Sequence, residues 1–184
     1  TGASEGAPAG RAPQEAMTPI RKLFIANRAE IALRIVRTAR RLGLATVVPW
    51  HALDRHGPAL NEADETVQLW GDPPVAAWLD GAGLIRAALD SGCDALHPGY
   101  GFLSENAGFA RAVAEAGLVF VGPDAAAIEL MGDKISARRF AVVHGVPVTP
   151  SADEADDPAT FAERAQAVGF PLLIKGAAGG GGKG

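Results

Sequence analysis

Short apolar segments alternate with helical segments along most of this chain, and this alternation restricts its possible folds more than any other feature. The predicted strands are residues 22–26, 45–50, 66–69, 94–97 and 118–121. The predicted helices between them are residues 29–42, 83–91 and 106–116. Strands and helices that alternate at this spacing form a parallel sheet with helices on both faces. The sequence therefore predicts one complete α/β domain.

The segment 29–42 carries the strongest helical pattern. Its apolar residues recur every three or four positions, and arginines occupy positions on or beside the opposite face. Asn27, with Glu30 three residues later, resembles a capping box, and Gly43 is typical of a helix end. We therefore expect a helix that begins with a cap at Asn27. The apolar residues are Ile31, Ala32, Ile35, Val36, Ala39 and Leu42, and the arginines are Arg34, Arg37, Arg40 and Arg41.

A second unit is predicted to begin after Gly122-Pro123, where the alternation stops. Two helices follow at residues 125–131 and 134–144, and the proline-rich segment PVTPSADEADDP then marks a boundary. A further helix at 158–168 and a strand at 171–175 lead into a glycine-rich loop. The chain thus divides into a first domain, 20–123, and the start of a second, 124–184.

Composition argues against several classes of protein. The chain has 17 Lys and Arg against 21 Asp and Glu, a net charge of −4, whereas nucleic-acid binding usually requires a basic excess. Cys93 is the only cysteine, so an internal disulfide is impossible and a zinc cluster is disfavoured. No apolar run reaches the roughly 18 residues of a membrane span. We expect neither a nucleic-acid nor a membrane partner.

The first 19 residues are rich in Ala, Gly and Pro and are predicted to be a disordered tail or linker. They lack the apolar core of a secretory signal. Glu5 and Glu15 are acidic residues of a kind that mitochondrial presequences avoid. The expected localisation is therefore cytoplasmic.

The segment GAAGGGGKG, residues 176–184, indicates a phosphate-binding loop. Glycines allow backbone N–H groups to approach phosphate oxygens closely. The P-loop pattern of nucleotide hydrolases is not met, because it requires glycine at position 177 and Ser or Thr at 184, where this chain has Ala177 and Gly184. A flexible linker is the alternative, although linkers rarely follow an apolar strand such as PLLIK directly.

Two lysines support the same interpretation. Lys175 closes the apolar segment 171–175, where a buried ammonium group needs a negative partner. Lys134 lies in the first turn of a predicted helix capped by Asp133, at the positive end of the helix dipole. A bound phosphate would make both positions favourable. The alternatives are a lysine that extends to solvent at a strand end and an exposed lysine paired with Asp133.

The loop HPGYGFLSEN, residues 97–106, leaves the carboxyl end of a predicted strand, where ligands bind in open parallel sheets. Gly99 and Gly101 flank Tyr100, while Phe102 and Leu103 are expected to pack beneath the loop. A tight structural loop with a packed tyrosine is the alternative. His97 is expected to be held by hydrogen bonds rather than to bind a metal.

Taken together, these motifs resemble those of the biotin carboxylase family, in order and in spacing. The family includes biotin-dependent acetyl-CoA, propionyl-CoA, methylcrotonyl-CoA, pyruvate and urea carboxylases. The resemblance covers residues 20–184. The matching stretches are IANRAEIALRIVRTARRLG, ADETV, HPGYGFLSENAGFA, GPDAAAIELMGDKISAR and IKGAAGGGGKG.

The resemblance implies a Rossmann-like pre-ATP-grasp domain at 20–123. It also implies the start of an ATP-grasp domain at 124–184, which stops within a glycine-rich lid. The implied reaction is ATP-dependent carboxylation of biotin by bicarbonate through carboxyphosphate, with Mg²⁺ or Mn²⁺ on the nucleotide. Tyr100 and Gly101 match residues beside the biotin ring. The implied ATP-binding residues are Lys134, Lys175, Gly179, Gly180, Gly181, Gly182 and Lys183.

The resemblance also implies partners: a biotin carboxyl carrier protein or domain, a carboxyltransferase, and further copies of the chain. The acyl acceptor is selected by the carboxyltransferase and is not encoded in this segment; acetyl-CoA, used in fatty acid biosynthesis, is one candidate. The family's metal-binding and catalytic residues lie further along. We therefore expect none within these 184 residues and no catalysis by this segment alone.

Two single positions depart from the family pattern, and the loop VVPWHALDRHGPALNEADE is unusual for the family at Pro49, Trp50 and His51. Ala29 replaces the usual glycine and is expected to suit a helix with little other effect. At position 41 this chain has arginine, where many family members have an acidic residue. In the family, that acidic residue lies near a dimer contact with the residue that matches Arg37, so Arg41 puts this contact in question.

Two other functions remain open. One is a different ATP-grasp ligase, such as a carbamoyl phosphate synthetase, against which HPGYGFLSEN argues. The other is a non-catalytic binding or assembly module of the same fold.

Overall fold

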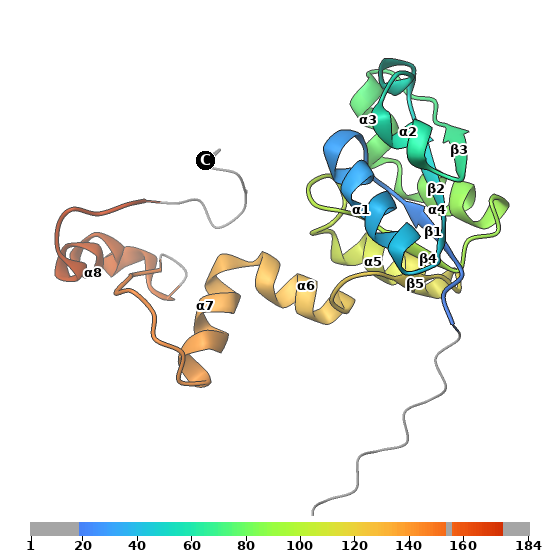
Figure 1. Cartoon of the computed structure of the whole chain (residues 1–184). Helices are drawn as coiled ribbons and strands as arrows, with labels where there is room; N and C mark the ends of the chain where they lie inside the picture. The colour runs from blue at the N-terminus through green and yellow to red at the C-terminus, as the bar shows by residue number, and fades with distance from the viewer. Residues whose placement is uncertain (1–18, 154–155, 175–184) are drawn as a thin grey trace, which may run out of the picture.

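A computed structural model describes residues 19–153 and 156–174, and it contains a sheet of five parallel strands (Figure 1). The strand order is β3-β2-β1-β4-β5, and every neighbouring pair is parallel. The predicted parallel α/β sheet is therefore confirmed. The strands are β1 Lys22–Ile25, β2 Ala45–Trp50, β3 Glu65–Gln68, β4 Ala95–His97 and β5 Val119–Phe120.

Alternating residues of the strands build two cores, one on each face of the sheet. Leu23 and Ile25 of β1 point to one face, and Phe24 points to the other, as the two-residue period of a strand requires. Helices α1 (Ala29–Arg41) and α2 (Pro58–Glu62) cover the first face. Helices α3 (Pro74–Leu79), α4 (Gly81–Asp90) and α5 (Ala107–Glu115) cover the second.

The short elements of this domain were not predicted. Helices α2 and α3 have only five and six residues, and the 3-10 turn η1, Ala52–Asp54, has three. Segments of this length contain too few apolar repeats to show a helical period. Helix α3 nevertheless contributes to the core, because Trp78 is buried and stacks on Phe102 with ring centroids 5.6 Å apart.

Beyond the sheet, the chain forms helices whose bounds are close to those predicted (Figure 1). They are α6 Ala125–Gly132, α7 Lys134–Val143 and α8 Phe161–Val168, with the 3-10 turn η3 at Pro158–Thr160. Asp133 caps α7 as expected, because its carboxylate accepts a hydrogen bond of 2.7 Å from the Ser136 N–H. The division of the chain at residues 123–124 stays a prediction.

The strand predicted at 171–175 is wrong for its described part. Residues 171–174 have no regular secondary structure, and the side chains of Leu173 and Ile174 are 79% and 84% exposed. A strand requires a neighbour that exchanges backbone hydrogen bonds with it. Within residues 19–153 and 156–174, no strand pairs with this segment. Lys175 and residues 1–18 of the predicted tail lie outside the described residues.

The start of α1 differs from the expected capping box. Arg28 is the N-cap residue and makes no side-chain capping bond. Asn27 is 0% exposed, and its side chain turns instead toward the loop after β4. The Asn27–Glu30 spacing predicted a helix cap, but the side-chain amide of Asn27 binds backbone carbonyls that are distant in sequence instead.

The backbone of this turn is also unusual at Ala29. Ala29 begins α1 with a φ of +51°, in the left-handed region that favours glycine. The expectation that alanine simply suits a helix at this position is therefore wrong. For an L-residue with a side chain, this conformation costs about 1–2 kcal/mol.

We predict that Ala29→Gly stabilises the protein. The relief of left-handed strain exceeds the extra chain entropy that glycine gives the unfolded state, about 0.4–1 kcal/mol, so a net gain of about 0.5–1 kcal/mol is expected. Urea unfolding measures this change. Ala32→Gly is the contrasting variant: in a regular part of α1 the same substitution should destabilise by more than about 1 kcal/mol, because it adds the loss of a buried methyl group to the helix-propensity cost. A lower unfolding midpoint for Ala29→Gly would contradict the strain.

Candidate functional site

The loop after β4 lies at the point where the sheet changes direction. The chain proceeds from β1 to β2 and β3 on one side, then crosses to β4 and β5 on the other side of β1. The carboxyl ends of β1 and β4 therefore flank a topological switch point, where ligands bind in open parallel sheets. Residues 98–101 follow β4 at this edge, and Asn27 follows β1.

Asn27 joins the two sides of the switch point. Its Nδ2 donates hydrogen bonds to the carbonyl oxygens of Pro98 at 2.7 Å and Tyr100 at 2.9 Å. Its Oδ1 accepts a hydrogen bond of 2.9 Å from the Arg28 N–H. Sequence reasoning missed this role, because the capping pattern at Asn27 and Glu30 suggested a purely local one.

His97, the last residue of β4, is hydrogen-bonded in place as expected. The Gly99 N–H donates to its Nδ1 at 2.9 Å. Burial lowers the pKa of His97, which favours the neutral ring that this acceptor role requires. Within residues 19–153 and 156–174, no group of three or more His, Cys, Asp or Glu side chains could hold a metal ion.

The loop needs its two glycines. Gly99 and Gly101 have φ angles of +67° and +72°. A Cβ on Gly99 would lie 2.6 Å from Asn27 Nδ2 and 2.7 Å from Ile31 Cγ2, so a side chain there would displace the loop. Gly101 is required by its backbone conformation alone, because its Cβ would meet open space.

Tyr100 is presented to solvent rather than packed. Its side chain is 67% exposed, so the alternative of a packed tyrosine is wrong. Phe102 and Leu103 are partly buried against the core beneath the loop, as predicted. A large exposed side chain on a well-anchored loop is a feature of binding sites rather than of core packing.

The predicted ATP-binding residues are only partly within the described chain. Lys134 is the first residue of α7 and is exposed. The Ser136 hydrogen bonds lower the pKa of the neighbouring Asp133 carboxyl, which remains ionised beside Lys134 at neutral pH. The other six predicted residues, Lys175, Gly179, Gly180, Gly181, Gly182 and Lys183, lie outside the described residues.

Comparison with known proteins identifies the family. Residues 19–128, more than half of the chain, match the family described as "Biotin carboxylase, N-terminal domain". The chain belongs to the biotin carboxylase family. Residues 133–184 match a second family, described as "Carbamoyl-phosphate synthase L chain, ATP binding domain". The resemblance noted from the sequence motifs is thus confirmed.

Several relatives align with nearly the whole length of this chain. The mitochondrial methylcrotonoyl-CoA carboxylase subunit alpha of Glycine max is 46% identical over 166 residues, 90% of this chain and 23% of the relative. The biotin carboxylase of Haemophilus influenzae is 45% identical over 167 residues, 90% of this chain and 37% of the relative. The chain therefore spans between 23% and 37% of the length of these two relatives.

A solved structure shows the same fold. It is the biotin carboxylase domain of the 2-oxoglutarate carboxylase of Hydrogenobacter thermophilus, in complex with MgADP, ADP and bicarbonate. It aligns with a TM-score of 0.84 and 38% identity, covering 91% of this chain and 37% of that chain.

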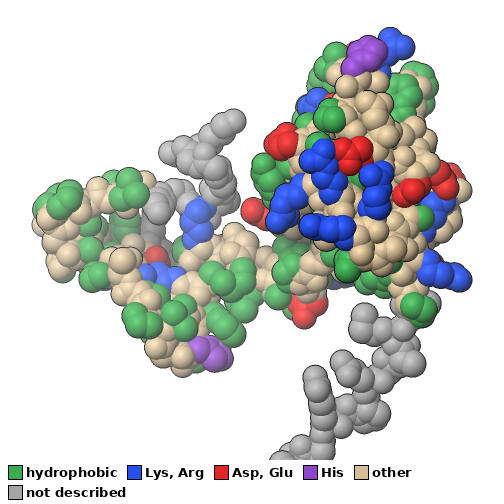
Figure 2. All heavy atoms as spheres, in the orientation of Figure 1, with side chains coloured by type: hydrophobic (Ala, Val, Ile, Leu, Met, Phe, Trp, Pro, Cys, Tyr) green, Lys and Arg blue, Asp and Glu red, His purple; other side chains and the backbone are tan. Residues whose placement is uncertain are grey.

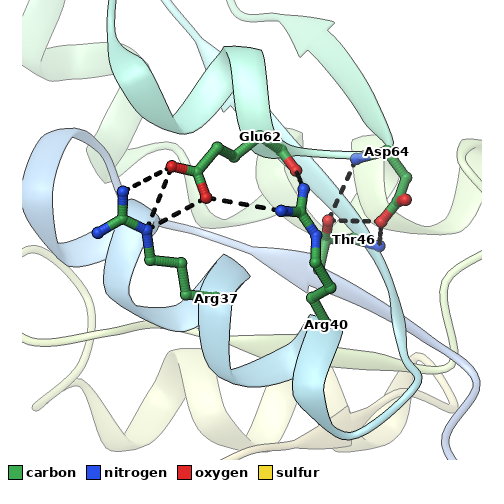
Figure 3. Close-up of polar contacts among 5 residues, drawn as sticks. All are labelled: Arg37, Arg40, Thr46, Glu62 and Asp64. Atoms are coloured by element: carbon green, nitrogen blue, oxygen red, sulfur yellow. Dashed lines mark hydrogen bonds and ion pairs between the residues drawn. The ribbon is translucent and has the colours of Figure 1, made fainter.

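The exposed face of α1 carries the arginines that bear on the predicted oligomer contact. Figure 2 shows basic and acidic side chains intermingled over this helix. Arg37 Nη2 donates to Glu62 Oε1 at 2.6 Å, and Arg40 donates to the Glu62 backbone carbonyl (Figure 3). The hydrogen bond from Arg37 lowers the pKa of the Glu62 carboxyl. Arg37 thus has an acidic partner within its own chain, supplied by α2 rather than by position 41.

A second carboxylate, Asp64, joins β2 to the start of β3 in the same region (Figure 3). Its Oδ2 accepts hydrogen bonds of 2.8 Å from both the backbone N–H and the hydroxyl of Thr46. These bonds lower the pKa of the Asp64 carboxyl. A lowered folded-state pKa stabilises the fold above the unfolded pKa, and this contribution is lost as the pH falls through the folded value.

We predict that Asp64→Asn lowers the urea midpoint at pH 7 by about 0.2–0.5 M, since a mostly exposed carboxylate contributes under about 1 kcal/mol. The difference from the wild type should shrink as the pH falls below the ordinary aspartate pKa of about 3.9 and toward the lowered folded-state pKa of Asp64. Urea titrations at pH 7, 5 and 3 measure it. Asp90→Asn, at an exposed carboxylate of α4, is the control. A difference that is constant with pH would contradict the Thr46 bonds as the source.

Proposed function

We propose that this chain forms the N-terminal part of a biotin carboxylase, which carboxylates biotin on a carrier protein with bicarbonate and ATP through carboxyphosphate. The observation that carries the proposal is the exposed Tyr100 on a loop anchored at the switch point, in a chain that belongs to this family. The chain spans 37% of the biotin carboxylase of Haemophilus influenzae, so the complete reaction requires residues beyond these 184.

The proposal gives each predicted residue a chemical task. Tyr100 and Gly101 lie beside the biotin ring. Lys134 and Lys175, with Lys183 and the glycines 179–182, bind the ATP phosphates. Positive groups and Mg²⁺ stabilise the negative charge that develops on phosphate during transfer. MgADP and bicarbonate in the Hydrogenobacter thermophilus structure support the choice of these ligands; Mn²⁺ as an alternative metal stays a prediction.

The proposed partners are a biotin carboxyl carrier, a carboxyltransferase and further copies of the chain. The relatives act on different acceptors, as their names methylcrotonoyl-CoA, pyruvate and urea carboxylase indicate. Acetyl-CoA as acceptor, a role in fatty acid biosynthesis and a cytoplasmic location stay predictions, and several relatives are named as mitochondrial. No helix in the described part of the chain is long and apolar enough to cross a membrane.

The test uses a complete biotin carboxylase whose N-terminal part is this sequence. Bicarbonate-dependent ATP cleavage should accelerate when free biotin is added, with carboxybiotin as the product. ATP-dependent formation of carbamoyl phosphate without biotin would favour the other ATP-grasp ligase instead. A folded protein that binds the carrier but cleaves no ATP would favour the assembly module. Residues 1–184 alone should show no biotin-dependent turnover.

We predict that Tyr100→Ala in the complete enzyme raises the KM for free biotin by about tenfold and leaves the KM for ATP unchanged. Tyr100 is 67% exposed, so loss of its ring should remove a ligand contact rather than core stability. Steady-state kinetics with biotin and ATP varied separately measure the two constants. Phe102→Ala is the control, because loss of its stacking on Trp78 should lower the melting temperature. A collapse of stability with an unchanged biotin KM would make Tyr100 structural.

We predict that Lys134→Gln and Lys175→Gln each weaken ATP binding about ten- to a hundredfold. A charge-assisted hydrogen bond to phosphate contributes roughly 1.5–3 kcal/mol. Neither substitution should lower the melting temperature without ATP, whereas saturating ATP should stabilise the variants far less than the wild type. Calorimetry of the complete enzyme measures the affinity. Wild-type affinity in both variants would show that these lysines are ordinary surface charges.

A further inference from the structure

Asn27 is one of only two buried polar side chains within residues 19–153 and 156–174, the other being Thr46. A buried amide is costly unless its donors and acceptor are hydrogen-bonded. Asn27 meets this requirement fully: both Nδ2 hydrogens have carbonyl acceptors, and Oδ1 accepts the Arg28 N–H. The groups that Asn27 binds through these three hydrogen bonds therefore indicate its role in the structure.

The two carbonyls that Asn27 binds lie beyond the end of the sheet. Parallel pairing of β1 with β4 ends at His97, and the Ala26 N–H already donates to the His97 carbonyl at 2.9 Å. The Pro98 and Tyr100 carbonyls belong to the loop that follows. The bonds from Asn27 consequently fix the loop and add nothing to the strand ladder.

The loop is held from both sides of Gly99. The two bonds from Asn27 reach the residues immediately before and after it, Pro98 and Tyr100. Gly99 itself lies so close to Asn27 and Ile31 that even a methyl group would not fit. The backbone of residues 98–100 therefore has one position relative to β1, and that position determines where the exposed Tyr100 side chain begins.

We propose that Asn27 is a positioning residue for biotin, which acts by fixing the Tyr100 backbone and does not itself touch the substrate. The inference rests on the proposed function of Tyr100 beside the biotin ring. It assigns to the β1–α1 turn a share in biotin binding, although that turn lies about 70 residues before the loop in sequence.

The first experiment tests the geometry in the 184-residue chain itself. Tyr100 is the only tyrosine, so tyrosine labelled with ¹³C at its carbonyl gives a single NMR signal, from the carbon whose oxygen accepts the Asn27 bond. Asn27→Ala should shift or broaden this signal. Thr46→Val is the matched control, because it removes the hydroxyl of the other buried polar residue and should leave the signal in place. An unchanged signal in Asn27→Ala would overturn the proposal.

The second experiment measures function in the complete enzyme. Asn27→Ala should raise the KM for free biotin about tenfold, because the loop that carries Tyr100 loses the hydrogen bonds that fix it. The KM for ATP and the rate of biotin-independent ATP cleavage should stay within about twofold of the wild type. Thr46→Val should change none of these constants. Asn27→Ser, which keeps one donor, should give an intermediate biotin KM and serves if Asn27→Ala does not fold.

The outcomes separate the two proposals. Equal rises in the biotin and ATP constants, or no rise in either, would overturn the positioning role and leave Asn27 as a structural amide. A wild-type enzyme that ignores biotin would overturn the proposed function, and the carbonyl signal would then still decide whether Asn27 fixes the loop.

Discussion

The pairing of β1 with β4 is the contact on which the other features of this domain depend. Phe24 lies opposite Leu96 in this pair, and both side chains are fully buried. At the amino end, the Asp94 carboxylate accepts the N–H groups of Arg21 and Lys22, each at 2.9 Å, which fixes the register. A shift of one residue would reverse the two faces of β1 and separate its carboxyl end from the loop after β4. The strand order creates the switch point, and this register places the carboxyl end of β1 beside the loop after β4.

The sequence was sufficient for the elements that bury a long, regular apolar face. Helix α1 repeats its apolar residues along its whole length of 13 residues, and its predicted end lies within one residue of the observed end. The strand prediction for residues 171–174 was wrong because an apolar run forms a strand only where a neighbouring strand pairs with it. Helices α2 and α3 were not predicted because they are too short to show a periodic apolar pattern. The connecting loops, rather than such a pattern, place them against the sheet.

The candidate site was predictable where its chemistry is local. Gly99 and Gly101 mark a loop with left-handed backbone conformations, and both angles are positive in the structure. The role of Asn27 was not predictable in this way, since its acceptors are 71 and 73 residues away. Lys134 shows a third case: its place at the start of α7 was predicted correctly, whereas its contact with a nucleotide stays a prediction.

The strained backbone at Ala29 and the buried amide of Asn27 belong to one turn, and each helps to explain the other. The Asn27 N–H donates to the Ile25 carbonyl at 2.7 Å, which bends the chain sharply at the end of β1. Helix α1 must then start at once, because the Ala32 N–H donates to the Arg28 carbonyl and Ala32 is fully buried. Ala29 lies between these two constraints and takes the left-handed conformation as a result. Strain of this kind persists only where the surroundings over-determine the backbone. In this turn the surroundings are the core face of α1 on one side and the loop that carries Tyr100 on the other.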